Sequence, residues 1–199
     1  MKDTLIVWHS GEICNTNFFN RAEEKQTAWL LVRRGEVVCA LCSGALAVHA
    51  SYLRHYRDEE GKRHYGWIAQ GRCDACNVYP ALIPSFIMPH KHYKSDVVER
   101  VVGEAEAGRN VEHSGGCAVD ASTMRRWVRE FEKRGEWAAG CLNSKLPAGD
   151  GGQGAPLDFQ GLPLLQQLAR LLRGYPAQGG GGVIGNVNII LTTRNCGFL

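Results

Sequence analysis

The sequence predicts an α+β fold, and three patterns in its 199 residues support that prediction. Two Cys-x-x-Cys pairs flank a polar insert whose side chains alternate as in a β-hairpin. Downstream of the second pair, apolar residues recur at helical spacing in two separate runs. Two more apolar segments follow glycine-rich stretches near the C-terminus. We therefore expect a small hairpin unit, then a helical unit, then a C-terminal apolar helical hairpin.

The cysteine pairs are Cys39 with Cys42 and Cys73 with Cys76. If residues 43–72 fold back as two strands, the four thiolates can surround one tetrahedral Zn²⁺ ion. Disulfides are the alternative. They are less expected because the N-terminal apolar stretch is too short for a signal sequence, and thiols persist in a reducing cytoplasm. The pattern predicts a zinc ribbon over residues 39–78 in a cytoplasmic protein.

The arms of the predicted hairpin are residues 46–57 and 63–70, closing over the polar stretch 58–62. Strict alternation places the aromatic side chains of the arms on shared faces. Two interpretations remain open: a small aromatic core beside the metal, or a platform on which bases of a single strand stack. Zinc needs no histidine beside four thiolates, so surface hydrogen bonding or an acidic partner is expected for five histidines: His49, His55, His64, His90 and His92.

The segments on either side of the ribbon are less regular. Within residues 1–38 we expect a strand at 4–8, an irregular stretch at 9–26, and either a strand or a helical turn at 28–32. Residues 79–94 contain three prolines and no helical period, which predicts an ordered extended connector. Its basic end, residues 90–94, could follow a phosphate backbone.

A three-helix unit is predicted over residues 95–137. Ser95 is the expected N-cap of the first helix, whose valines share one face, and Gly108 ends it. A short second helix or turn is expected at 111–118. Asp120 is a good N-cap for the third helix, on which Met124, Trp127 and Phe131 follow helical spacing.

The polar side of the third helix is basic, and this layout is typical of a helix-turn-helix. Near its start, Ser122, Thr123, Arg125 and Arg126 would approach base edges of double-stranded DNA. Further along, Arg129, Lys133 and Arg134 would contact phosphates. The alternative is a solvated basic face on an ordinary helical hairpin.

Charge is distributed in blocks, although the net charge is only +3. Residues 39–94 carry seven Lys or Arg against four Asp or Glu, and residues 121–134 carry five against two. Between these blocks, residues 95–120 carry two basic against six acidic side chains. This alternation favours a protein with a basic face over one with uniformly distributed charge.

These patterns together resemble a known family. The ribbon, the connector segment 82–89, Tyr93 and the segment 120–131 are similar to a bacterial family described only as a domain of unknown function. Its modules in turn resemble the N-terminal zinc-ribbon and helix-turn-helix part of insertion-sequence transposases. The resemblance covers roughly residues 39–131 and implies DNA binding, with the four ribbon cysteines as zinc ligands and residues 122–127 at the start of a recognition helix.

The last part of the chain, residues 138–199, reads as glycine-rich linkers at 149–154 and 179–182 around two apolar segments. Residues 162–172 predict an amphipathic helix, and residues 183–191 a closing helix or a strand. This apolar pair either packs on the N-terminal strand or pairs with another chain, as a homodimer or with a partner protein. No apolar run is long enough to span a membrane.

No catalytic motif is present in the sequence. It has no Gly-x-Ser-x-Gly, no His-Glu-x-x-His and no phosphate loop. A transposase nuclease domain, which holds metals with three acidic residues, would not fit after Gly140, where Asp150 and Asp158 are the only acidic side chains. We expect a zinc-dependent DNA-binding protein, either a regulator or the recognition part of a mobile element, and not an enzyme. The alternative is an adaptor that docks a partner chain through the ribbon and the C-terminal helices.

Overall fold

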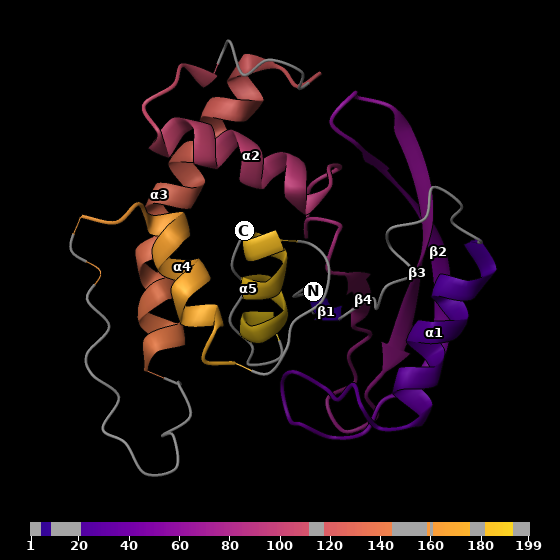
Figure 1. Ribbon diagram of the computed structural model, residues 1–199. Helices are drawn as coiled ribbons and strands as arrows, with labels where there is room; N and C mark the ends of the chain where they lie inside the picture. The colour runs from indigo at the N-terminus through magenta and orange to yellow at the C-terminus, as the bar shows by residue number, and fades with distance from the viewer. Residues whose placement is uncertain are drawn as a thin grey trace.

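The molecule consists of a mixed β-sheet with one helix on one side, and of four further helices on the other side (Figure 1). The computed structural model describes residues 5–8, 21–111, 118–144, 159, 161–175 and 182–192. Two of the predicted features, the linker at 149–154 and residues 179–181 of the second linker, lie outside these residues. We call these two parts the sheet half and the helical half.

The predicted hairpin is confirmed. Strand β2 (Ala47–Arg57) pairs antiparallel with β3 (Arg63–Arg72), in continuous register from Ala50↔Gln70 to Arg57↔Arg63. Asp58 holds the turn between them, because its carboxylate accepts hydrogen bonds from the amides of Glu60 and Lys62 and from the His64 ring. A short carboxylate-capped turn of this kind fixes the register of both arms.

The connector after the ribbon contributes a strand that the sequence did not predict. Strand β4 (Ala81–Pro84) pairs antiparallel with β3 and parallel with β1 (Leu5–Trp8), giving the strand order β1-β4-β3-β2. All four residues of β4 are buried. The prolines predicted extended backbone correctly, but β4 is buried on both faces and therefore lacks the alternation that marks a half-exposed strand.

Helix α1 (Arg21–Arg33) corrects the expectation for the N-terminal segment. The irregular stretch was expected to reach residue 26, and residues 28–32 were left open between strand and helical turn. The helix ends in a Schellman motif: the amides of Gly35 and Glu36 donate to the carbonyls of Val32 and Leu31, and Gly35 adopts φ 71°. Ala28 and Val32, one turn apart, are buried against the sheet.

The first two helices of the helical half lie close to their predicted positions. Helix α2 (Ser95–Glu106) buries its valines, and Gly108, at φ 73°, follows its end. The predicted N-cap was wrong by one residue: Lys94 is the N-cap, and Ser95 is the first, buried residue of the helix. Helix α3 (Ala121–Asn143) begins at the predicted cap, since the Asp120 carboxylate accepts from the amides of Ser122 and Thr123. The short helix expected at 111–118 lies outside the described residues except at its two ends.

Helix α3 is longer than the predicted unit, which ended at residue 137. Its buried side continues from Phe131 through Ala138 to Leu142, so the apolar stripe crosses that boundary without interruption. Helices α4 (Leu164–Leu172) and α5 (Gly182–Thr192) pack on α2 and α3 and share one apolar core with them. The C-terminal segments are therefore part of the helical half, and α5 also packs against β1.

Two acidic residues of α2 position the C-terminal helices. The Glu106 carboxylate accepts from the amide of Leu165 at 3.1 Å, in the first turn of α4. Two turns earlier, the Glu99 carboxylate accepts from the amide of Ile184 at 3.0 Å, in the first turn of α5. Each carboxylate accepts from a backbone N–H group that has no partner within its own helix, and its negative charge complements the positive N-terminal end of the helix dipole. The helical half is thus joined by polar contacts as well as by its core.

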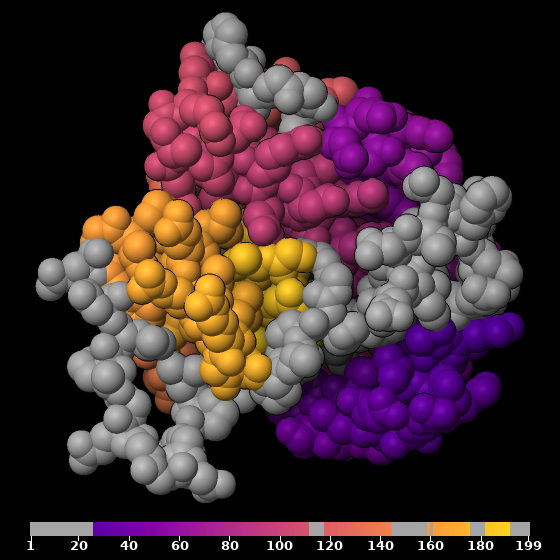
Figure 2. Space-filling model, viewed as in Figure 1, coloured from indigo at the N-terminus to yellow at the C-terminus, as the bar shows by residue number. Residues whose placement is uncertain are grey.

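The two halves meet at the tip of the hairpin and along the connector. The amide of Ala118, just before α3, donates to the carbonyl of Glu59 in the hairpin turn. Gly61, with φ 76°, lies so close to Ala118 that an added Cβ would be 2.7 Å from the Ala118 Cβ. In Figure 2 the hairpin lies directly against the helical half on the upper part of the face shown. Among the described helices, none is long and apolar enough to cross a membrane.

Candidate metal centre and nucleic-acid interface

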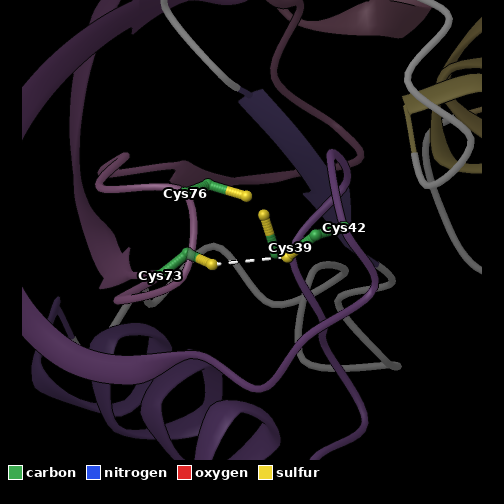
Figure 3. A group of neighbouring side chains, drawn as sticks. All are labelled: Cys39, Cys42, Cys73 and Cys76. Atoms are coloured by element: carbon green, nitrogen blue, oxygen red, sulfur yellow. Dashed lines mark hydrogen bonds between the residues drawn. The ribbon is translucent and has the colours of Figure 1, made fainter.

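The hairpin itself brings the two cysteine pairs together. Cys39 and Cys42 lie before β2, and Cys73 and Cys76 lie after β3. Because β2 and β3 are antiparallel, with Ala47 opposite Arg72, the start of one strand lies beside the end of the other. Figure 3 shows the result, in which the four side chains converge from two facing loops. The two cysteine pairs therefore meet because the insert folds back as a hairpin, and the length of the insert is less important for this.

Both loops have the same backbone design. In each, the amide of the first cysteine donates to the carbonyl five residues later, Cys39 to Gly44 and Cys73 to Val78, both at 2.9 Å. In each, the residue after the second cysteine has positive φ: Ser43 at 57° and Asn77 at 52°. Left-handed backbone is unusual outside glycine, asparagine and aspartate, so these turns are specific conformations shared by the two loops.

The sulfur atoms are spaced to hold one metal ion. The four Sγ atoms all lie within 4.8 Å of one another, and those of Cys42 and Cys73 are 3.6 Å apart. Four sulfurs bound to a zinc ion at about 2.3 Å would be about 3.8 Å apart in a regular tetrahedron. All four cysteines are free thiols, and their sulfur atoms lie much further apart than the two sulfurs of a disulfide bond. The predicted ligands are therefore brought together as a site that could hold a metal ion.

The surroundings of the site favour deprotonation of one thiol. Hydrogen bonds from the Cys76 thiol, and next from the amide of Gly44, lower the pKa of the Cys42 thiol to about 7. The same contact with Cys42, together with burial, raises the pKa of Cys76. Four thiolates cannot all be charged at this distance without a cation between them, so a bound metal would be needed to deprotonate the remaining thiols.

Gly44 was not singled out from the sequence. Its amide donates to Cys42 Sγ at 3.4 Å, and an added Cβ would lie 3.1 Å from the same sulfur. A glycine two residues after the second cysteine therefore allows the backbone to approach the ligand closely. A spacing of Cys-x-x-Cys-x-Gly could have indicated this role.

Helix α1 closes the centre from one side, which no pattern in the sequence indicated. Cys39 and Cys73 are almost fully buried, in one apolar cluster with Ala28 and Val32 of α1 and Leu82 of β4. Cys42 is exposed and Cys76 is partly so. The site is thus half enclosed, with two ligands inside the protein and two near its surface.

The described histidines do not join the cysteine cluster. Among the described residues, only the four cysteines form a cluster of three or more potential metal ligands. His64 is held by Asp58, His49 lies beside Tyr79, and the rings of His55 and His92 stack at 4.1 Å. The partners of these histidines thus lie outside the cysteine cluster.

The predicted DNA-contacting residues lie together on α3. Arg126, Arg129 and Lys133 are spaced by three and four residues and form an exposed stripe facing away from the buried Trp127 and Phe131. Arg125 is exposed on the flank of this stripe. The helix therefore has a solvent-facing basic side, which is a geometry that can contact phosphates or base edges.

The two residues expected at the very start of α3 have another role. The Ser122 amide and hydroxyl and the Thr123 amide all donate to Asp120. These contacts lower the pKa of the Asp120 carboxyl, the Ser122 hydroxyl contributing most. Ser122 and Thr123 thus participate in the helix cap, which makes the arginines the better candidates for base contact.

An acidic residue is present within the basic surface. Glu130 pairs with Lys91 of the connector at 3.0 Å and with Arg134 at 3.7 Å. The Lys91 side chain is mostly buried, and this burial lowers the pKa of its ammonium group although Glu130 opposes the shift. The contact fastens the connector to α3 and orients Arg134. It was not foreseen, because nothing in the sequence relates residue 91 to residue 130.

Residues 39–127 match the family model described as Domain of unknown function (DUF6431). The match runs from the first cysteine of the metal centre to Trp127 in α3, so the centre, the connector and α2 all belong to the matched domain. No curated protein and no solved structure matches the chain. The similarity to transposase modules therefore rests on the sequence pattern alone.

Proposed function

We propose that this protein is a cytoplasmic, zinc-dependent protein that binds double-stranded DNA, derived from a mobile element as a transposase-like recognition module or acting as a transcriptional regulator. Zinc is the metal we assign because four thiolates in a tetrahedral arrangement are its typical structural ligand set. With four protein ligands no position stays open for a substrate, so the metal would have a structural role. We expect no strand cleavage by this chain alone.

The observation that supports DNA binding best is the exposed basic stripe of α3. Arg126, Arg129 and Lys133 line one side of a helix whose opposite side is buried in the core. A helix held in this way can lie in a major groove without unfolding. We assign base contact to Arg125 and Arg126, within the first two turns, and phosphate contact to Arg129, Lys133 and Arg134.

The adaptor hypothesis has less support. It needs both the ribbon and the C-terminal helices to dock a partner, but Leu168 and Leu171 of α4 and Ile184, Val187 and Leu191 of α5 are all buried in the core of the chain. These side chains contact α2 and α3 and do not form a surface for another chain. The proposal therefore places the partner on α3.

Binding to fluorescein-labelled duplex DNA, measured at several salt concentrations, tests the proposal. Sites are first selected from a random duplex pool, because the target sequence is not known. Arg126→Ala should weaken the selected site by about 1–3 kcal/mol and flatten the preference over scrambled DNA. Lys133→Ala should weaken both duplexes alike and reduce the salt slope by about one.

Arg173→Ala is the matched control, since Arg173 is also an exposed arginine but follows α4. It should leave both affinities unchanged. Unaltered affinity of Arg125→Ala and Arg126→Ala for the selected duplex, in folded protein, would contradict the assignment of α3 as the DNA-contacting helix. A chelator that removes the metal should also abolish binding if the metal centre supports the interface.

A further inference from the structure

The outer face of the β2–β3 hairpin carries a group of side chains that neither the metal centre nor α3 uses. Pairing in register places His55 opposite Tyr65 and Leu53 opposite Trp67, on the same face. Nearer the tip, Arg57 and Arg63 form the next pair. Leu53 is 47% exposed and Tyr65 is 38% exposed, so large apolar surfaces remain in contact with solvent. We call this group the hairpin outer face.

The hairpin outer face is extended sideways by the connector. His92 stacks on His55 with ring centroids 4.1 Å apart and nearly parallel planes, and the centroid of the Tyr65 ring lies 6.4 Å from that of His55. Rings from three separate chain segments thus form one row. Each ring has a flat surface suited to stacking on a planar base.

The position of His92 is fixed by the backbone around it. The Arg57 amide donates to the His92 carbonyl at 2.8 Å, and the Lys94 amide donates to the Arg57 carbonyl at 3.0 Å. From the opposite face of β2, the Arg54 guanidinium donates to the carbonyls of Met88 and Lys91. A row of rings held by so many main-chain contacts is preorganised for a ligand.

Several basic groups lie around this row. Desolvation lowers the pKa of His55, and the charged groups that lower it further are all basic: His92, Arg63, Arg57 and Arg54. Asp58 is the acidic residue closest to His55 in the sequence, but its carboxylate lies within the hairpin turn and accepts three hydrogen bonds there. Glu59 and Glu60 lie in that turn, beyond the last pair of the strands. Flat rings bordered by arginines complement an unpaired, negatively charged strand, in which both bases and phosphates are accessible.

The hairpin outer face also adjoins α3. Lys91, the neighbour of His92, pairs with Glu130 of α3, and Arg126 and Arg134 act on the charge of Lys91. The connector therefore joins the basic side of α3 to the hairpin, with the mostly buried Lys91 between them. A duplex held by α3 would have its flanking strand beside the row of rings.

We propose that the hairpin outer face binds single-stranded DNA, with unpaired bases stacking on Tyr65 and the His55–His92 pair and with phosphates contacting Arg57 and Arg63. The proposal deepens the proposed function, on which its link to α3 rests. Unpaired DNA would thus be a second ligand of this protein, beside the duplex held by α3. The face is chemically distinct from α3, where arginine and lysine predominate and no exposed ring lies among Arg125, Arg126 and Arg129.

The test uses fluorescein-labelled oligothymidylate about 20 nucleotides long, which exceeds the site size of known single-strand-binding folds. The full-length, metal-loaded chain should bind it, and Tyr65→Ala should weaken binding about tenfold, as loss of one stacked base predicts. Arg63→Ala should reduce the salt slope by about 0.7. Tyr52→Ala is the matched control: Tyr52 is 39% exposed on the opposite face of the same hairpin, and its truncation should change nothing.

Parallel measurements on the selected duplex separate this inference from the proposed function. Retained duplex binding by Tyr65→Ala supports the inference, whereas equal loss on duplex and single strand would show that the face binds paired DNA and overturn it. Equal effects of Tyr65→Ala and Tyr52→Ala also overturn it. If the wild-type chain binds the duplex but not the oligothymidylate, the inference fails and the proposed function stands. If it binds neither, both fail.

Discussion

The sheet half and the helical half of the molecule are stabilised in different ways. In the helical half, α2 to α5 bury a continuous apolar core that includes Trp127, Phe131 and Leu168. In the half that contains the candidate metal centre, the apolar core is divided into two smaller clusters, one beneath α1 that counts Cys39 and Cys73 among its members and one around Tyr56 and Ile68. A core of that size stabilises little by itself, so a metal ion bound to the four thiolates would supply what apolar burial does not.

One chain thus combines two kinds of stability, which respond differently to metal removal and to truncation of core side chains. Removing a metal should affect the sheet half first, whereas truncating a core side chain should affect the helical half first. The hairpin tip, the connector and the packing of α5 against β1 join the two halves. Four substitutions test this division, from the largest expected effect to the smallest.

Cys73→Ser should have the largest effect. It removes one buried ligand, and structural zinc sites contribute apparent binding free energies of about 10–16 kcal/mol at neutral pH. We expect the purified, reduced variant to contain no stoichiometric zinc by elemental analysis. Cys141→Ser is the control, because Cys141 is a free cysteine of α3 outside the cluster, and this variant should retain one zinc per chain. A Cys73→Ser protein that keeps one tightly bound zinc would refute the four-thiolate site.

Trp127→Ala should come second and act on the other half. Trp127 is 1% exposed in the helical core, and truncation of such a side chain costs about 3–5 kcal/mol. Trp137, on the same helix, is 45% exposed, and Trp137→Ala should change stability by no more than about 0.5 kcal/mol. Urea unfolding followed by circular dichroism measures both. Zinc retention in folded Trp127→Ala would confirm that the halves are stabilised separately. An equal loss of unfolding free energy in Trp127→Ala and Trp137→Ala would contradict the burial of Trp127 in the helical core.

Gly61→Ala tests the junction between the halves. Its left-handed backbone should cost about 1–2 kcal/mol for any residue with a Cβ. Gly35→Ala pays the same backbone cost, at φ 71°, but no atom lies within 4 Å of its added Cβ. Gly61→Ala should therefore lower the free energy of unfolding more than Gly35→Ala does, because only the Cβ added at Gly61 would clash with Ala118. Identical midpoints of urea unfolding would mean that the hairpin tip does not pack against the start of α3.

Glu99→Gln should have the smallest effect, visible as a change in pH dependence. Burial raises the pKa of the Glu99 carboxyl above its ordinary value of 4.5, although the amides of Ile184 and Val183 favour the charged form. The stabilisation from this group is complete below the ordinary value and is lost as pH rises through the raised one. The difference in unfolding free energy between wild type and Glu99→Gln should therefore change over that interval. A difference that stays constant from pH 4 upward would contradict the raised pKa.

Part of this structure was predictable because its signals are local. Alternation gave both arms of the hairpin within a few residues, the four cysteines were identified by spacing alone, and Asp120 followed from cap chemistry. The end of α1 was also predictable, since basic residues followed by Gly35 mark a helix C-terminus, but the apolar run was too short to choose between helix and strand.

Other features depend on contacts between distant residues, which periodicity does not report. Strand β4 lies between β1 and β3 in the sheet and all four of its residues are buried, so its sequence shows no alternation. The capping of α4 and α5 by Glu106 and Glu99 joins residues that lie far apart in the chain. Likewise the pairing of Lys91 with Glu130, which links the connector to the basic surface of α3, exists only in the folded molecule.

Hydrogen exchange followed by mass spectrometry, with and without a zinc chelator, tests the central claim most directly. With zinc bound, amides in β2, β3 and β4 should be protected to a degree comparable with those of α2 and α3. After chelation of the reduced protein, protection should collapse around the cysteine loops and along the hairpin while α2 to α5 remain protected. Unchanged protection of the hairpin in protein shown to contain no metal would contradict the claim that a metal ion stabilises this half.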